Sequence, residues 1–178
     1  MKKLVISLMM LICSSFMFGL EWNLDEEGTL LITGEGEMPN FENSDKTPWH
    51  NFLEDIKRVE IQEGITSIGD YSFNHCINLC DVSIPDSVSY IGKYAFAFTN
   101  LSSIKLSDNV TTIGDAAFFW DNNLVDVWIG DGIESIGMGA FMLCGFQAVS
   151  LPDNIIEIGE DAFPCEYTVR DMKSSGTF

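Results

Sequence analysis

Positive charge is scarce in this chain of 178 residues. It carries 9 Lys and Arg against 27 Asp and Glu, which gives a formal net charge of −18 at pH 7. Affinity for nucleic-acid backbones and for anionic membrane surfaces rests largely on clustered Lys and Arg side chains. The composition therefore argues against nucleic acid, and against an anionic membrane surface, as a partner.

Long apolar runs are also rare, and the one that occurs lies at the N-terminus. Residues 4–12 are apolar except for Ser7 and follow Lys2 and Lys3. This order is typical of a secretory signal peptide, so we expect residues 1–19 to be removed on export. An uncleaved anchor is the alternative, although residues 4–20 are at the short end for a membrane span. We expect no membrane span after cleavage, and a secreted or cell-surface location.

The sequence lacks the usual arrangements of catalytic and metal-binding residues. Only two histidines occur, His50 and His75, and there is no Walker loop, no Gly-x-Ser-x-Gly elbow and no His-Glu-x-x-His. We predict no catalytic residues, no cofactor and no metal site, and thus a protein that is not an enzyme. A glycoside hydrolase that uses two of the many carboxylates is the enzymatic alternative.

An internal repeat dominates the rest of the chain. An Ile-Gly pair with a Phe four residues after the Gly recurs five times, and these phenylalanines are Phe73, Phe96, Phe118, Phe141 and Phe163. Their spacings are 23, 22, 23 and 22 residues. A fixed period in this range is typical of a solenoid of stacked coils. We therefore assign about five repeats to residues 53–168.

Each repeat contains the pattern of a short strand. Apolar residues alternate with polar ones at Val59 and Ile61 and again at Val82 and Ile84, which predicts strands with one buried face. Such strands would stack about 4.8 Å apart in a parallel sheet. A turn, a second apolar pair and a glycine corner follow, and the Ala-Phe segment is expected to form a short helical turn with Phe inside. The predicted fold is a mainly β solenoid.

The ends of a solenoid need caps, because the terminal coils have no neighbour on one side. Residues 20–52 are predicted to form an N-terminal β-hairpin and loop, in which Trp49 and Phe52 plug the first coil. Residues 169–178 are expected to be a C-terminal tail or a degenerate cap.

The repeats resemble a known family. Residues 79–96 read LCDVSIPDSVSYIGKYAF, which is similar to the BspA-like leucine-rich repeats, with the approximate pattern L-x-x-I-x-I-P-D-S-V-x-x-I-G-x-x-A-F-x-x-C. The resemblance covers about residues 22–165. It implies a leucine-rich-repeat solenoid of the secreted or surface adhesin type, without catalytic residues. The Cys after Phe is kept only at Cys76 and Cys144, and we expect no wall-anchoring tail.

The strand pattern identifies a candidate binding face. The residues between the buried strand positions should point outward on one exposed sheet, and they are Arg58, Glu60, Asp81, Ser83, Ser103, Lys105, Asp126, Trp128 and Ser150. An outward Trp128 is a plausible contact anchor, or it packs against a neighbouring coil. Phe98, Phe119 and Trp120 are a second candidate surface, with core or loop packing as the more usual role of such residues.

Four cysteines follow the predicted signal peptide. Export permits disulfides, and Cys144 and Cys165 fall near equivalent positions of adjacent coils, so we predict a bridge between them. A bridge between Cys76 and Cys80 is an alternative. Zinc at His75, Cys76 and Cys80 is disfavoured because a fourth ligand is missing.

One acidic position recurs in the predicted turns, at Glu63, Asp86, Asp108, Asp131 and Asp153. We expect these carboxylates to accept backbone N–H bonds in their turns. Calcium binding by the column is the alternative.

The sequence thus predicts a non-catalytic secreted or cell-surface binding module. Its expected role is adhesion or recognition of extracellular protein or glycan ligands through the exposed sheet. The alternative is a structural spacer that self-associates end to end.

Overall fold

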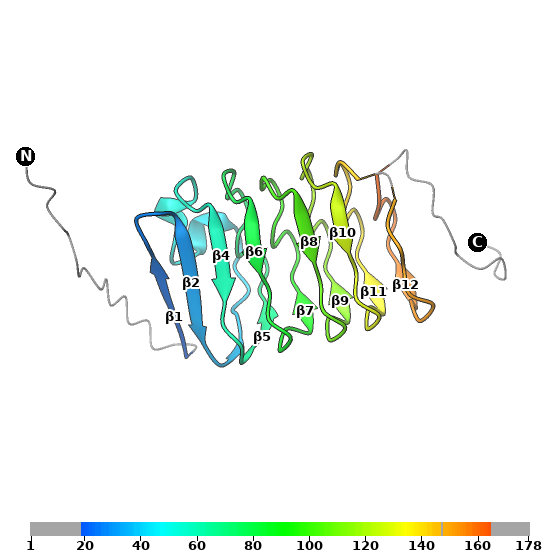
Figure 1. The fold of residues 1–178 in the computed structure, drawn as a ribbon, viewed down its shortest axis with the longest axis horizontal. Coiled ribbons are helices and arrows are strands. Elements are labelled where there is room, and N and C mark those ends of the chain that lie inside the picture. The colour runs from blue at the N-terminus through cyan, green and yellow to red at the C-terminus, as the bar shows by residue number, and fades with distance from the viewer. Residues whose placement is uncertain (1–18, 147, 165–178) are drawn as a thin grey trace, which may run out of the picture.

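The chain winds into a stack of coils with a strand wall on each of two sides (Figure 1). The computed structural model describes residues 19–146 and 148–164. The front wall contains β4 (Arg58–Ile61), β6 (Asp81–Ser83), β8 (Ser103–Lys105) and β10 (Asp126–Trp128). The rear wall contains β3 (Gly36–Glu37), β5 (Ile65–Ile68), β7 (Tyr90–Ile91), β9 (Thr112–Ile113), β11 (Ser135–Ile136) and β12 (Glu157–Ile158). Successive strands of the rear wall pair in parallel. In the front wall β4 pairs in parallel with β6, and β8 with β10. The predicted mainly β solenoid is confirmed.

A hairpin begins the stack. The strands β1 (Leu20–Leu24) and β2 (Thr29–Gly34) are antiparallel to each other, and β2 pairs in parallel with β4. The hairpin therefore extends the front wall by two strands. Two short 3-10 helices, η1 (Ser44–Lys46) and η2 (His50–Phe52), follow before the first repeat.

The front wall is divided where the repeat is shorter. One plate has the order β1-β2-β4-β6 and a second contains β8 and β10, while described residues 148–150 lie in no strand. The missing pairings coincide with the two 22-residue steps, at which the loop from Phe to the next core residue is one residue shorter. At these two steps the amides of Asn100 and Gly145 donate to the carbonyls of Leu79 and Leu124, which lie just before β6 and β10. The expectation that all five outward strands form one sheet is wrong, because one missing loop residue shifts the entry to the strand.

The third side of each coil consists of turns, and the predicted helical turn at Ala-Phe is wrong. The amides of Tyr71, Phe73 and His75 donate to carbonyls of the next coil at 2.8 to 3.0 Å, while the amides between them donate to the carbonyl three residues earlier and close β-turns. Tyr71 and His75 have φ values of 58° and 63°. A helix would need negative φ throughout and would direct every amide within its own turn. In the described residues, 3-10 helix occurs only at η1 and η2.

A column of aromatic rings fills the interior. Phe73, Phe96, Phe118 and Phe141 are fully buried, with successive ring centroids 5.2, 5.3 and 5.0 Å apart and near-parallel planes. Trp49 adds one more ring, 5.6 Å from Phe73, and its indole N–H donates to the Ser72 carbonyl at 2.8 Å. The cap loop therefore plugs the first coil through Trp49, as predicted, whereas Phe52, the other predicted plug, is half-buried and lies beside Trp22.

The glycine after each of the rear-wall strands β5, β7, β9, β11 and β12 is required by close backbone approach. A Cβ added at Gly92 would lie 2.5 Å from the Asp70 nitrogen and 2.6 Å from the Gly69 carbonyl carbon. Both are backbone atoms of the preceding coil and cannot move without separating the two coils. Glycine therefore recurs at this position because neighbouring coils lie close together, and not because the backbone there needs a positive φ.

We expect Gly92→Ala to lower the free energy of unfolding by roughly 1–3 kcal/mol, because the methyl group would overlap backbone atoms. Urea unfolding followed by circular dichroism measures the change. Gly139→Ala is the comparison variant, since its added Cβ would meet nothing nearer than 3.8 Å. Its φ of 61° adds backbone strain, but Ala116 already adopts a φ of 52° at the equivalent position, so its loss should be smaller. Equal losses in the two variants would contradict the close-approach argument.

Candidate front-face binding surface

The structure places all nine predicted binding residues at exposed positions. Eight lie on β4, β6, β8 and β10, where Val59, Val82, Ile104 and Val127 alternate with them and turn inward. Ser150 is exposed but lies outside any strand. We call the outward side chains of β1, β2, β4, β6, β8 and β10 the front face.

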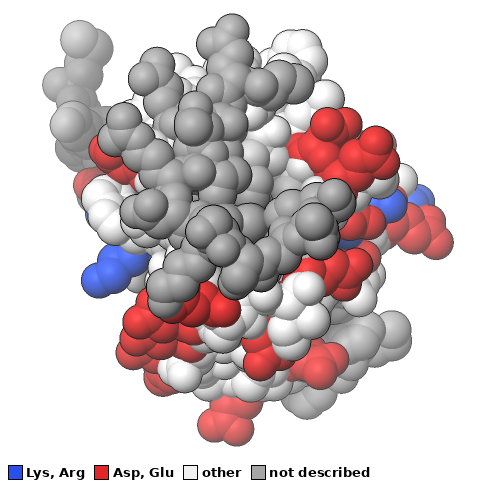
Figure 2. Space-filling view, turned by 90° about the vertical axis from the view of Figure 1, so that its right-hand side faces the viewer, with Lys and Arg blue, Asp and Glu red and all other residues white. Residues whose placement is uncertain are grey.

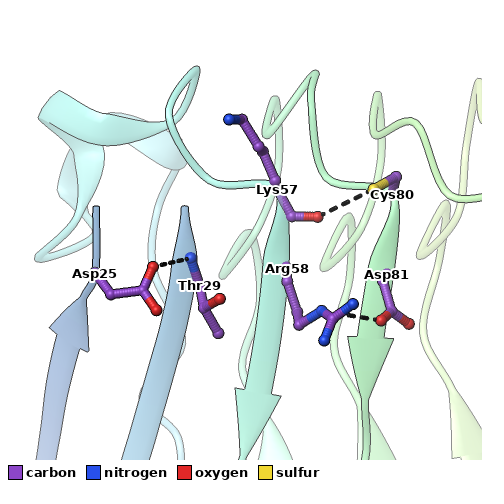
Figure 3. Close-up of polar contacts among 6 residues, drawn as sticks. All are labelled: Asp25, Thr29, Lys57, Arg58, Cys80 and Asp81. Carbon is purple, nitrogen blue, oxygen red and sulfur yellow. Dashed lines mark hydrogen bonds and ion pairs between the residues drawn. The ribbon is translucent and has the colours of Figure 1, made fainter. Parts of the chain in front are cut away.

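The first plate of the front face carries opposite charges in register. Arg58 is the strand partner of Asp81, and its Nε lies 3.1 Å from the Asp81 Oδ2 (Figure 3). Both side chains are more than half exposed, so solvent screening leaves the pair little net stabilising effect. The pair nevertheless gives this plate a fixed pattern of polar groups.

The second plate carries the most exposed tryptophan of the front face. Trp128 is 55% exposed and is the register partner of Lys105, while Asp126 is the partner of Ser103. The alternative in which the Trp128 side chain is covered by a neighbouring coil does not fit this exposure. An indole held on a strand and open to solvent combines a large apolar area with few freely rotating bonds.

Sequence reasoning missed the contribution of the hairpin to this face. Asn23, Leu31, Glu60 and Ser83 follow one another across β1, β2, β4 and β6 in a single row of register partners. Leu31 is 37% exposed. In β2 the buried residues Leu30 and Ile32 alternate with exposed ones, as in the repeat strands. This alternation is the sequence signal that could have placed β2 in the front wall.

The second candidate surface, on the turn side of the coils, has a packing role in the structure. The Phe98 ring lies 4.5 Å from His75 and 6.1 Å from Trp120, with near-parallel planes in both pairs. Phe119 contacts Phe98 edge-on at 5.5 Å. Because stacked rings cover one another's faces, this row presents mainly ring edges to solvent. The arrangement favours contact between coils as the role of these residues.

In the acidic turn column the Asp108 carboxylate accepts a backbone bond, and the donor lies in the next coil rather than in its own turn. The Asp131 amide donates to the Asp108 Oδ1 at 3.0 Å, which links two successive turns. Within the part of the chain that the structure describes, no group of three or more His, Cys, Asp or Glu is placed to hold a metal ion.

The cysteine thiols are not arranged as metal ligands either. Cys76 is buried, and burial raises the pKa of its thiol to about 12. The Cys80 thiol donates to the Lys57 carbonyl at 3.4 Å (Figure 3). Both thiols are free, so the alternative Cys76–Cys80 bridge is wrong. The Cys144 thiol donates to the Phe118 carbonyl at 3.0 Å; Cys165 lies outside the described residues, and its bridge to Cys144 stays a prediction.

Comparison with known repeats decides the family. The pattern described as BspA type leucine-rich repeat region matches residues 50–169 in six copies. The chain belongs to the BspA-type leucine-rich-repeat family. Among curated proteins, none matches this chain.

Solved structures of bacterial leucine-rich-repeat proteins resemble this BspA-type repeat protein. A leucine-rich repeat protein from Eubacterium ventriosum is 28% identical with a TM-score of 0.72 over 79% of this chain and 38% of that one. The Treponema (T. pallidum) leucine-rich repeat protein is 22% identical, with a TM-score of 0.56 over 83% and 81%. A leucine-rich cell surface protein from Faecalibacterium prausnitzii is 19% identical, with a TM-score of 0.53 over 86% and 52%. This chain therefore spans less than two fifths of the Eubacterium protein.

The surface of the BspA-type repeat protein is strongly acidic. Figure 2 looks along the stack from its C-terminal end and shows Asp and Glu grouped around the rim, with few Lys or Arg among them. None of the described helices is long and apolar enough to cross a membrane.

One carboxyl group of the BspA-type repeat protein is buried. Asp121 follows Phe118 by three residues, the position that Cys76 and Cys144 occupy in other coils, and its side chain is fully buried. Its Oδ2 accepts from the Thr99 hydroxyl at 2.6 Å, while its Oδ1 has no partner among the described residues. Burial raises the pKa of Asp121 to about 7, although bonds from Thr99 and Leu101 oppose the shift.

Asp121 should make stability depend on pH. Its pKa is about 7 in the folded protein against an ordinary 3.8, so the folded state holds the extra proton between these values. The free energy of unfolding should therefore fall as pH rises from about 4 to about 7. In Asp121→Asn the side chain cannot titrate. The free energy of unfolding of this variant should therefore fall less over the same pH range, by on the order of 3 kcal/mol.

Urea unfolding of wild type and Asp121→Asn at several pH values between 4 and 8 gives the free energy of unfolding of each. The contribution of Asp121 is the difference between the two at each pH. Other carboxyl groups titrate equally in both and cancel. A difference that does not change with pH would show that Asp121 ionises normally in the fold.

Proposed function

We propose that this protein is a non-catalytic binding module, secreted or held at the cell surface, that recognises extracellular protein or glycan ligands through the front face. The observation that carries the proposal is the Trp128 indole, exposed on a strand beside Lys105 and Asp126. Exposed aromatic side chains with charged neighbours are common anchors of recognition surfaces.

The construction of the front face supports recognition by a preformed surface. Every outward side chain alternates with one buried in a single core, so the backbone under the face is fixed by packing as well as by pairing. A surface that is already ordered loses little conformational entropy on binding. The two plates offer a partner two adjacent patches, one centred on Arg58 and Asp81 and one on Trp128.

The family supports the extracellular location and the absence of catalysis. Leucine-rich repeats of this kind are typically binding modules, and one of the similar solved structures is a cell surface protein. Together with the apolar N-terminal run after Lys2 and Lys3, this favours an exported protein.

The binding role predicts a strong effect of Trp128→Ala. Wild type and variant should be compared on arrays of purified extracellular-matrix proteins and of glycans, with affinities for each bound ligand measured by surface plasmon resonance. We expect affinity to fall about tenfold or more in the variant, as for a central aromatic anchor. Trp120→Ala, the same change on the turn side, is the matched control. Equal affinities for Trp128→Ala and wild type would contradict the front-face assignment.

End-to-end assembly as a structural spacer is the second candidate, and the last described coil favours it. In the described part of the chain β12 pairs only with β11, which leaves its other edge open. Ile156, directly before β12, is 80% exposed. An open strand edge beside an exposed apolar side chain is a common template for pairing with another chain.

A spacer should grow with concentration. Sedimentation equilibrium would then show a mass that rises continuously with protein concentration, and Ile156→Glu would suppress the growth. Met138→Glu, at a side chain that is 57% exposed on the turn side, should leave it unchanged. A constant monomer mass across concentrations would exclude the spacer role.

A further inference from the structure

A concave site lies at the opposite end of the stack from β12. A pocket of about 460 Å³ opens between the end of β1, the hairpin turn after it and the segment from η2 to β4. Its apolar lining comes from Trp22, Leu24 and Phe52, each of which is half-buried. The ring centroids of Trp22 and Phe52 are 6.3 Å apart, so the pocket has an aromatic floor that is partly open to solvent.

The floor is held in place by the buried aromatic column. Trp22 packs edge-on against Trp49 at 6.2 Å, and Trp49 in turn stacks on Phe73 and is anchored by its bond to the Ser72 carbonyl. The indole of Trp22 is therefore positioned before any ligand arrives.

The rim of the pocket is strongly acidic. Four carboxylates line it, from Asp25, Glu26, Glu54 and Asp55, against the single cation of Lys57. The Asp25 Oδ1 accepts from the Thr29 amide at 2.8 Å (Figure 3) and from the Glu27 amide at 2.9 Å. The backbone bond from Thr29 is the main cause that lowers the pKa of Asp25, so this carboxylate stays ionised. An aromatic surface surrounded by carboxylates suits an organic cation, which gains both charge pairing and contact with the ring face.

The strand beside the pocket is open on one edge. Within the described residues β1 pairs only with β2, so the backbone groups of its other edge can accept a further strand. Trp22 and Leu24 face inward along β1 while Glu21 and Asn23 face out. An extended segment laid along β1 would place alternate side chains on the same side as Trp22, over the pocket.

We propose that this pocket, the cationic-side-chain pocket, binds an extended segment of a partner protein that inserts a Lys or Arg side chain over Trp22 and among the carboxylates. Charge complementarity selects this occupant. A second copy of the chain, with a net charge of −18, would bring like charge to an acidic rim. The proposal concerns the N-terminal end of the stack and does not depend on ligand binding by the front face.

The test uses the full chain and two synthetic peptides, one of alternating Lys and Thr and one of alternating Glu and Thr. Isothermal titration calorimetry at near-physiological salt should show binding of the Lys peptide only. The triple variant Glu26→Gln, Glu54→Gln, Asp55→Asn should lower that affinity at least tenfold.

The matched control neutralises three carboxylates at the other end of the stack, through Glu134→Gln, Glu157→Gln and Glu160→Gln. It changes the net charge equally and should alter the affinity by less than twofold. Equal losses in both triples would mean general attraction to an acidic protein and would overturn the proposal, as would binding of the Glu peptide with equal affinity.

Tryptophan fluorescence supplies a second readout. The Lys peptide should change the emission of the wild-type protein, and Trp22→Phe should remove most of that change while keeping an aromatic ring in the floor. Trp128→Ala should retain the change, which separates this site from the front face. A change that persists in Trp22→Phe but disappears in Trp128→Ala would place the cation on the front face instead and would refute the pocket.

Discussion

Backbone hydrogen bonds between successive coils set the geometry on which the rest of this protein depends. They run along the rear wall, through the alternate amides of the turn side and, at the 23-residue steps, along the front wall. Their length holds neighbouring coils close enough that the corner positions accept only glycine and the interior phenylalanines stack at about 5 Å. The exposed side chains inherit this spacing, so the pattern of polar and aromatic groups on the front face is a direct result of the coil repeat.

The repeat allowed the fold to be predicted from the sequence because each coil restates the same buried positions. The outward direction of Arg58, Asp81 and Trp128 followed from simple alternation. Features that depend on single residues were beyond that reasoning. The division of the front wall arises from one missing loop residue. The turn side is not helical because positions such as Tyr71 have positive φ values. Asp121 resembles the many other acidic residues in the sequence, and its burial becomes visible only in the folded chain. Pairing of β2 with β4 was missed because the hairpin was considered apart from the repeats.

The N-terminal hairpin links the two surfaces to which we assign binding. Its outward residues, such as Leu31, continue the front face, while its inward residues Trp22 and Leu24 form the floor of the cationic-side-chain pocket. The same segment closes the core through the contact of Trp22 with Trp49. A cap that is needed to cover the first coil thus also provides a second recognition surface, whereas the repeats use most of their aromatic rings for stacking between coils and expose Trp128 on the front face.

The unequal walls give the stack a direction in which it can deform. The rear wall is a ladder of six strands without interruption, whereas the front wall is divided between β6 and β8 and ends after β10. Force that bends the stack backward meets continuous strand pairing on the rear side and an unpaired boundary between β6 and β8 on the front side. The curvature would change at that boundary first, spreading Asp81 away from Ser103 while each plate keeps its own internal register. A partner that bridges both plates would therefore hold the boundary closed, and its attachment would stiffen the molecule as a whole.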